Sequence, residues 1–187
     1  MEQEISKALE VLKAGGLILY PTDTVWGIGC DATNAAAVEK IYRLKRSADK
    51  KSMLVLVGRV DDVARYVGRV PEVAWQLLEV SDKPLTLILP GAGGVAGSLI
   101  PEEGTIGIRV PAHEFCSGLL KRLGRPLVST SANISGEASP ARFDEIAKEI
   151  IAGVDYVVPR SCEGRMTGKP SSIIALDEGG GFKIIRE

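Results

Sequence analysis

The segment LILYPTDTVWGIGCDATN, residues 17–34, decides the fold and carries the first candidate site. Its first four residues are apolar and end at Pro21, so they predict a short buried strand, because the run is too brief for a helix. Three small polar residues follow the strand: Thr22, Asp23 and Thr24. Gly27 and Gly29 then allow a positive φ or a close approach of backbone to a neighbouring group. We therefore predict that a ligand binds at the end of this strand.

Length and composition indicate one globular domain with an ordinary hydrophobic core. The chain has 187 residues, of which 45% are hydrophobic and 25% charged, and its formal net charge is -1. A near-neutral chain has no global attraction to nucleic acid or membrane, so any polyanion site must be local. Three cysteines lie far apart without a C-x-x-C pair, which indicates neither a disulfide framework nor a zinc site.

The N-terminal segment MEQEISKALEVL is acidic and amphipathic, unlike a secretory leader. No apolar run approaches the roughly 20 residues that a membrane-spanning helix needs. We expect a cytoplasmic protein with no membrane partner.

Hydrophobic periodicity predicts alternating helices and strands. The predicted helices cover residues 5–12, 34–45, two segments within 60–80, 112–123 and 143–151. The predicted strands cover residues 17–20, 53–57, 85–89, 105–110, 126–130, 156–158, 171–176 and 182–185. Loose alternation with strands clustered at the end predicts one α/β domain around a mixed sheet.

Several kinds of chemistry are excluded by the residues present. His113 is the only histidine, and its position after a proline favours a surface or helix-capping role over triad catalysis. The segment GRMTGKP at 164–170 is one residue short of a P-loop and has Pro170 where a magnesium-binding Ser or Thr belongs. The segment GAGGVA at 91–96 is not followed by the helix that a dinucleotide site requires.

Three elements remain as binding candidates. Residues 40–51 carry six Lys or Arg residues and one aspartate, a local charge of +5, although a solvated helix end explains such a segment equally well. Residues 129–136, STSANISG, follow a strand with several hydroxyls, in either a ligand site or a capped turn. Arg109 ends a strand, where it binds a carboxylate in a bidentate fork or forms a surface ion pair.

Together these elements resemble one family. The motifs are PTDTVWGIGCDA at 21–32, LK at 44–45 with KSMLVLV at 51–57, TIGIRVPAH at 105–113, STSANISG at 129–136 and SSII at 171–174. In this order they resemble the YrdC/TsaC family of L-threonylcarbamoyladenylate synthases over nearly the whole chain. The chain is similar to the short form of that family, so we expect one YrdC-like domain over residues 1–187.

The resemblance implies both a fold and an activity. The fold would be a twisted mixed sheet flanked by helices, with a basic concave cleft. The activity would convert ATP, L-threonine and bicarbonate to threonylcarbamoyl-AMP and pyrophosphate. A separate transferase complex would then move the threonylcarbamoyl group to an adenosine of tRNA, which makes tRNA a further expected contact. Mg²⁺ would arrive with ATP, and the sequence nominates no protein ligand for it.

The resemblance also assigns site residues by motif position. Threonine would be held by Thr24, Arg109, Ser131 and Ser171, with Arg109 on its carboxylate. ATP would be held by Lys45, Lys51, Thr105, Asn133 and Arg186. Lys45 would also neutralise the charge that develops on the phosphate during the reaction.

One position departs from the family pattern. The K-x-R signature of the family would place an arginine at position 47, where this chain has Ser47, so Arg46 or Lys50 would have to replace its charge. Two other functions remain open at this point. One is an RNA-binding module that uses the basic cleft, and the other is an ATP-dependent enzyme of the same fold with another amino acid or carbamoyl donor.

Overall fold

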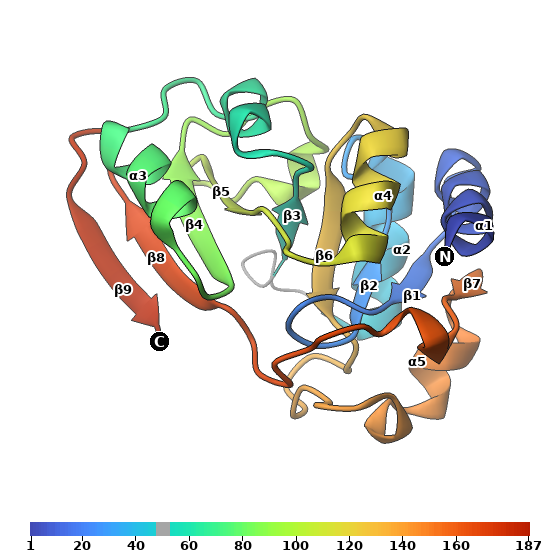
Figure 1. Ribbon diagram of the computed structural model, residues 1–187. Coiled ribbons are helices and arrows are strands. Elements are labelled where there is room, and N and C mark those ends of the chain that lie inside the picture. The colour runs from blue at the N-terminus through green and yellow to red at the C-terminus, as the bar shows by residue number, and fades with distance from the viewer. Residues whose placement is uncertain (48–52) are drawn as a thin grey trace.

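The computed structural model describes residues 1–47 and 53–187, and in this part of the chain helices alternate with strands (Figure 1). The α-helices are α1 (Glu2–Lys13), α2 (Ala35–Lys45), α3 (Glu72–Val80), α4 (Glu114–Leu123) and α5 (Lys148–Ala152). Four short 3₁₀ helices are η2 (Val60–Arg65), η3 (Gly97–Leu99), η4 (Phe143–Glu145) and η5 (Arg160–Cys162). The strands are β1 (Ile18–Tyr20), β2 (Gly27–Gly29), β3 (Leu54–Leu56), β4 (Leu85–Pro90), β5 (Thr105–Arg109), β6 (Leu127–Ser131), β7 (Tyr156–Val157), β8 (Ser172–Leu176) and β9 (Phe182–Arg186).

All strands of the described chain join one mixed sheet in the order β7-β1-β2-β6-β3-β5-β4-β8-β9. The pairs β1–β7, β3–β5 and β4–β8 are parallel, and the other neighbours are antiparallel. This topology confirms the α/β class and the mixed sheet. It also brings segments from distant parts of the chain to one sheet, so that β2, β6, β5 and β8 contribute to the same region.

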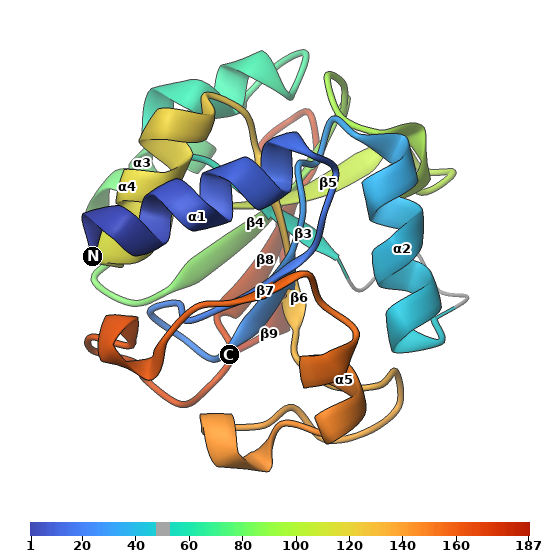
Figure 2. The ribbon, with the colours of Figure 1, turned by 90° about the vertical axis from the view of Figure 1, so that its right-hand side faces the viewer.

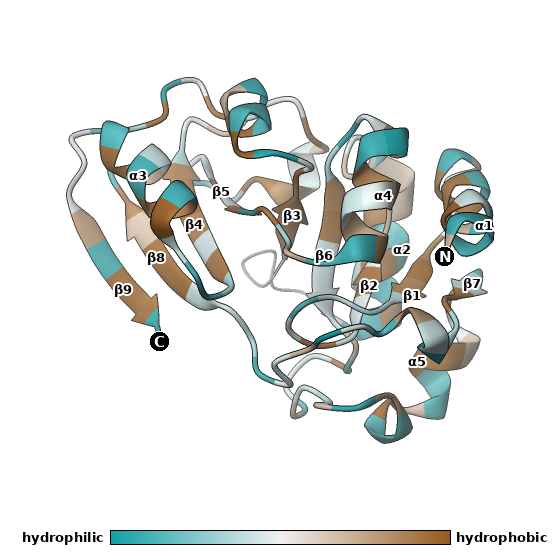
Figure 3. Cartoon of the chain, in the orientation of Figure 1, coloured by the Kyte–Doolittle hydropathy of each residue, from teal (hydrophilic) through white to brown (hydrophobic). Residues whose placement is uncertain are grey.

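The core has two parts, one on each face of the sheet. In and beside β1 the side chains alternate, so that Ile18 and Tyr20 join the cluster of α1 and α4, whereas Leu17 and Leu19 join the cluster that includes α2. Figure 2 shows α1 and α4 on one side of the sheet and α2 on the other. Hydropathy follows this arrangement, since brown residues fill the strands and teal residues lie on the outer helix faces (Figure 3). Burial on both faces of the sheet therefore explains why residues 17–20 are all apolar.

The helices leave half of one sheet face uncovered. Ile106 and Ile108 of β5 point into the core cluster of the α2 side, so by alternation Thr105, Gly107 and Arg109 point to the opposite face. That is the face that α1 and α4 cover farther along the sheet, but they do not extend over β5, β4 and β8 (Figures 1 and 2). A pocket lies on this uncovered area.

The structure differs from the predicted elements at three places. Residues 27–29, where no strand was predicted, form strand β2 between β1 and β6. Of the two uses predicted for Gly29 the structure shows the close backbone approach, since a Cβ there would lie 2.6 Å from the carbonyl oxygen of Val128. The predicted helix at 143–151 divides into η4 and α5, because the chain is extended at Ile146, which is buried. The first helix within 60–80 is the 3₁₀ helix η2.

Candidate functional site

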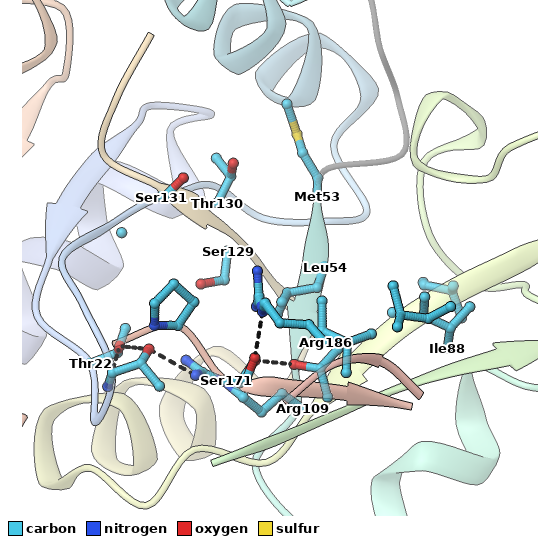
Figure 4. A pocket seen from close by; sticks show the side chains of 18 of the residues that line it. Thr22, Met53, Leu54, Ile88, Arg109, Ser129, Thr130, Ser131, Ser171 and Arg186 are labelled. Atoms are coloured by element: carbon cyan, nitrogen blue, oxygen red, sulfur yellow. Dashed lines mark hydrogen bonds between the residues drawn. The ribbon is translucent and has the colours of Figure 1, made fainter. Parts of the chain in front are cut away.

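The pocket has a volume of about 470 Å³ and lies between the β1–β2 loop, the end of β6 and the exposed face of β5, β4 and β8. Six of the predicted site residues line it: Thr24, Thr105, Arg109, Ser131, Ser171 and Arg186. Figure 4 shows four of them, with Arg109, Ser171 and Arg186 gathered on one side and Ser131 across the pocket. The structure thus brings together residues that are up to 162 positions apart in the sequence.

Arg109 is the most constrained cation of the pocket, since it is only 2% exposed. Its Nη1 donates to Thr24 Oγ1 at 2.8 Å, and its Nη2 lies 3.4 Å from Asp23 Oδ1. The Nε–H of Arg109 is buried without a hydrogen-bond partner in the described residues. Because a guanidinium binds best through two parallel N–H groups, Arg109 has a donor to offer a planar anion.

Asp23 lies behind Arg109 and does not line the pocket. Its Oδ2 accepts from the backbone N–H of Ala112 at 3.1 Å, whereas its Oδ1 has no hydrogen bond within the described chain. The carboxylate therefore serves as the counter-ion of the buried guanidinium and helps to hold it in place.

A hydroxyl cluster joins the loop at residues 22–24 to Arg109. Thr22 Oγ1 lies 2.8 Å from Thr24 Oγ1, and it accepts from the backbone N–H of Thr24 at 3.0 Å. It also donates to the carbonyl of Val25 at 2.8 Å. This network holds Thr24 in place beside Arg109 and explains why the loop needs small hydroxyl side chains.

Ser171 and Arg186 lie on the same side of the pocket as Arg109 (Figure 4). Ser171 Oγ lies 2.7 Å from Thr86 Oγ1, and the Nε of Arg186 donates to the carbonyl of Ser171 at 2.9 Å. Burial lowers the pKa of Arg186, and the nearby positive charge of Arg109 lowers it further. Two guanidinium groups that repel each other at one pocket favour an anionic ligand beside them.

Lys45 and Asn133 do not line the pocket. Lys45 is 2% exposed, and its Nζ donates to the backbone carbonyls of Ser131 and Asn133, each at 2.6 Å. Burial lowers the pKa of Lys45 to about 8, so the group remains mostly protonated at pH 7. The Asn133 amide donates to the carbonyls of Ile134 and Glu137. Both residues thus shape the loop that carries Ser131.

Two remaining predictions concern the basic segment. Lys51 and Lys50 lie outside the described residues. Arg46 has a left-handed backbone with φ 52° at the end of α2, and its Nη2 bonds Glu149 of α5 at 2.7 Å. Arg46 does not line the pocket. Arg46 therefore forms a surface ion pair in this structure and does not replace the family arginine at the pocket.

Several lining residues were not singled out from the sequence. They include Thr86, Ile88, Glu103 and Pro170. A signal exists for Thr86, because it alternates with the buried Leu85 and Leu87 and so had to point away from the core. No local pattern distinguishes Glu103 or Pro170, since loops bring them to the pocket.

The segment GRMTGKP, rejected as a P-loop, is a structural partner of the β1–β2 loop. The N–H groups of Thr167 and Gly168 donate to the carbonyls of Asp23 and Thr24 at 3.0 and 2.9 Å. His113 is the N-cap residue of α4, as predicted, but it is buried rather than on the surface. Its Nε2 bonds the carbonyl of Glu163 at 2.7 Å, which helps to fix the start of this segment.

Two absences hold for the part of the chain that the structure describes. Residues 1–47 and 53–187 contain no group of three or more His, Cys, Asp or Glu side chains placed to hold a metal ion. Among the same residues no helix is both long and apolar enough to cross a bilayer.

The fold and the pocket define a class of protein: an α/β domain with a pocket on a partly uncovered sheet, lined by hydroxyl side chains and two arginines. Residues 10–187 match the model of the Sua5/YciO/YrdC family, whose description reads "Telomere recombination", and the chain belongs to this family. The resemblance noted in the sequence is thereby confirmed.

Curated relatives carry one enzyme name. The threonylcarbamoyl-AMP synthase of Hahella chejuensis is 34% identical over 172 residues, which cover 90% of this chain and 91% of that protein. The human threonylcarbamoyl-AMP synthase is 34% identical over 191 residues, covering 98% of this chain and 67% of the human protein.

Solved structures agree with the fold. P. abyssi Sua5 complexed with L-threonine has a TM-score of 0.85 at 28% identity, covering 94% of this chain. This chain spans 52% of the length of that Sua5 chain. E. coli YciO has a TM-score of 0.83 at 26% identity, with 100% of this chain and 90% of the YciO chain covered.

Proposed function

We propose that this chain synthesises threonylcarbamoyl-AMP from L-threonine, bicarbonate and ATP, with release of pyrophosphate. The names of the curated relatives support this activity, and the complex of P. abyssi Sua5 with L-threonine supports threonine as a ligand. A cytoplasmic location and action as one YrdC-like domain over residues 1–187 belong to the same proposal. A single sheet with strands from Ile18 to Arg186 supports the one-domain arrangement.

The observation that carries the proposal is the unpartnered Nε–H of Arg109 in the wall of a pocket rich in hydroxyls. A free amino acid presents a carboxylate, and Arg109 supplies the bidentate donor for it. Thr24, Ser131 and Ser171 lie around the same pocket and offer hydroxyls for the polar atoms of threonine. This assignment of the threonine site matches the expectation from the sequence.

The same pocket also offers groups for ATP. Thr105, Ser131 and Arg186 provide donors for phosphate oxygens, and Leu99 and Pro101 provide apolar contacts of the kind that a base requires. Lys45 and Asn133 act on ATP through the loop they support, since neither lines the pocket. Lys51 completes the ATP set by motif position.

The reaction needs positioning more than covalent catalysis. The threonine amine captures the bicarbonate carbon to form a carbamate, with loss of water. A carbamate oxygen then attacks the α-phosphorus of ATP, and pyrophosphate leaves. Arg109 fixes the carboxylate and so directs the amine, while Arg186 and the hydroxyl donors stabilise the phosphate charge. A pocket without a histidine suffices because the nucleophile belongs to the substrate.

Mg²⁺ fits this site as a companion of ATP. Glu103 is the one carboxylate among the described lining residues, and Mg²⁺ commonly binds phosphates and water with one carboxylate or none. When bound, the ion would neutralise phosphate charge. We assign no protein ligand to it. The product would pass to a threonylcarbamoyl transferase complex that acts on tRNA.

The test is to incubate the protein with ATP, Mg²⁺, labelled bicarbonate and L-threonine and to omit each in turn. Labelled threonylcarbamoyl-AMP with pyrophosphate, formed only when all are present, is the expected result. Product from another amino acid but not from threonine would point to the same-fold alternative. No nucleotide product from any amino acid would refute the proposal.

The carboxylate site is tested separately with Arg109→Lys. A lysine keeps the charge but loses the fork, so the KM for threonine should rise about 10- to 100-fold, as loss of a charge-assisted hydrogen bond predicts. Threoninamide lacks the carboxylate, so it should bind the wild-type enzyme much more weakly than threonine does. In the variant the difference in affinity between the two ligands should be much smaller. The matched control is Arg142→Lys, since Arg142 is a largely exposed arginine outside the pocket. If Arg109→Lys and Arg142→Lys discriminate equally between threonine and threoninamide, Arg109 does not bind the threonine carboxylate.

A further inference from the structure

A second pocket lies on another part of the molecule, between η2 and α4, which are neighbours in both ribbon views (Figures 1 and 2). Its volume is about 510 Å³, similar to that of the candidate active site. Pro126 at the start of β6 lines this pocket, whereas Ser131 at the end of β6 lines the first pocket. The two pockets therefore sit at opposite ends of one strand, about 15 Å apart along it.

Positive charge is concentrated in this second pocket. Its lining contains four cations and one acid: Arg59, Arg65, Lys121, Arg125 and Asp62. The described lining of the candidate active site contains only two cations, Arg109 and Arg186, with Glu103. The lining itself has an excess of three positive charges, and Asp61 and Asp31, just outside it, offset two of them through ion pairs with Arg59 and Arg125. The positive charge that remains favours an anion at this pocket.

The cations keep donors for a ligand. Lys121 is exposed and has neither a hydrogen bond nor an ion pair with any described residue. Arg65 meets Asp62 only at 3.4 Å, a weak surface contact that a stronger anion can displace. Arg125 uses Nη1 for the buried Asp31 at 2.8 Å, which leaves the other donors of a 60% exposed side chain free of described partners.

The surroundings restrict the anion further. The floor is formed by the nearly buried Val57, Tyr66 and Leu120, and Gly58 and Gly124 bring backbone to the rim. Cations from four segments converge on one volume: the β3–η2 connection, η2, α4 and the α4–β6 connection. A single carboxylate needs one arginine, whereas several converging cations suit a ligand with two or more negative charges.

We propose that this second pocket binds a phosphate-bearing ligand, either a small phosphate compound or the phosphates of an RNA backbone. The site is independent of the reaction proposed for the first pocket. Lys121, Arg65 and Arg125 supply the charge, with Arg125 held in place by Asp31.

The test is a titration of isotope-labelled protein followed by backbone amide NMR at physiological ionic strength, with pyrophosphate, AMP and a short RNA stem-loop as separate probes. The amides of Gly58 and Gly124 report the second pocket, and those of Gly27 and Gly107 report the first. Saturable shifts at Gly58 and Gly124 are expected. Shifts with pyrophosphate or AMP identify a small phosphate ligand, and shifts with RNA alone identify an RNA contact.

Charge reversal makes the result specific. Lys121→Glu and Arg65→Glu should each weaken binding at the second pocket about tenfold and reduce the salt dependence by about one phosphate contact, with the shifts at Gly27 and Gly107 unchanged. Lys83→Glu, an exposed position outside both pockets, is the matched control. Absence of saturable shifts at Gly58 and Gly124 with all three probes would overturn the proposal. The proposal would also be overturned if Lys121→Glu and Arg65→Glu bound the probe at the second pocket as strongly as Lys83→Glu does.

Discussion

Replacement of Lys45 by methionine tests whether this residue anchors the loop after β6. Lys45→Met keeps an unbranched side chain of similar length but removes the ammonium that donates to the carbonyls of Ser131 and Asn133 at 2.6 Å each. Both carbonyls would then face an apolar group, and the carbonyl of Ser131 would keep only the N–H of Asn133, at 2.9 Å. Because Ser131 lines the candidate active site, a change in the loop should also reach the ligand.

The magnitude follows from the two hydrogen bonds. Each bond is charge-assisted, and a buried carbonyl left without a partner costs about 1–3 kcal/mol. Removal of the ammonium also removes the cost of burying its charge, which offsets part of the loss. We expect the free energy of unfolding to fall by about 2–4 kcal/mol.

Urea denaturation of the wild type and Lys45→Met measures this loss, and Lys40→Met is the matched control on the same helix. Lys40 is exposed and donates to one carbonyl, that of Gly15, at 2.8 Å, so its replacement should cost under about 1 kcal/mol. Equal stability of the two variants would refute the anchoring argument. Steady-state kinetics then separate the two possible roles of Lys45. If Lys45 anchors the loop, Lys45→Met should raise the KM for ATP and lower turnover. If Lys45 contacts a phosphate directly, Lys45→Met should lower turnover strongly without a loss of stability.

Three further predictions concern the same core and the loop. Gly29→Ala should lower stability by about 1–3 kcal/mol, because its Cβ would lie 2.6 Å from the Val128 carbonyl, whereas Gly27→Ala, with nearest atoms at 3.4 Å, should cost much less in urea denaturation. Burial lowers the pKa of Lys45 from 10.5 to about 8. Between pH 8 and pH 10.5 the unfolded chain therefore binds more protons than the folded chain, so the folded state gains stability as the pH rises. Over this range the free energy of unfolding of the wild type, relative to that of Lys45→Met, should rise by about 3 kcal/mol. If the difference in the free energy of unfolding between the wild type and Lys45→Met did not change with pH, the lowered pKa of Lys45 would be contradicted. Ser47→Arg should lower the apparent KM for ATP if position 47 is a phosphate contact, and an unchanged or higher KM would show that it is not.

Much of the fold was predictable because burial repeats along short segments. The short apolar run at residues 17–20 and the pattern of residues 105–109 indicated strands, and the apolar spacing within 114–123 indicated a helix. The helix predicted over residues 34–45 begins where expected, and the Oδ1 of Asn34 caps it by accepting from Ala37 N at 3.1 Å. In each case the pattern reflects contacts within a few residues or one buried face.

The errors arose where a distant partner decides the local structure. The glycines at 27 and 29 have low strand propensity, yet pairing with β1 and β6 makes them a strand. The buried position of Lys45 also depends on distant partners, because its Nζ donates hydrogen bonds to two carbonyls 86 and 88 residues away. No pattern in a single segment contains that information.

The candidate active site also shows why a near-neutral chain can bind a polyanion. Arg109 and Arg186 face the same pocket, and the charge of Arg109 makes protonation of Arg186 less favourable. Asp23 pairs with Arg109 from outside the pocket, and the Nε–H of Arg109 remains without a partner among the described residues. An anion beside the two arginines would satisfy that donor and also relieve their repulsion. Both effects favour the bound state, so ligand affinity here depends on the placement of two charges and not on the charge of the whole chain.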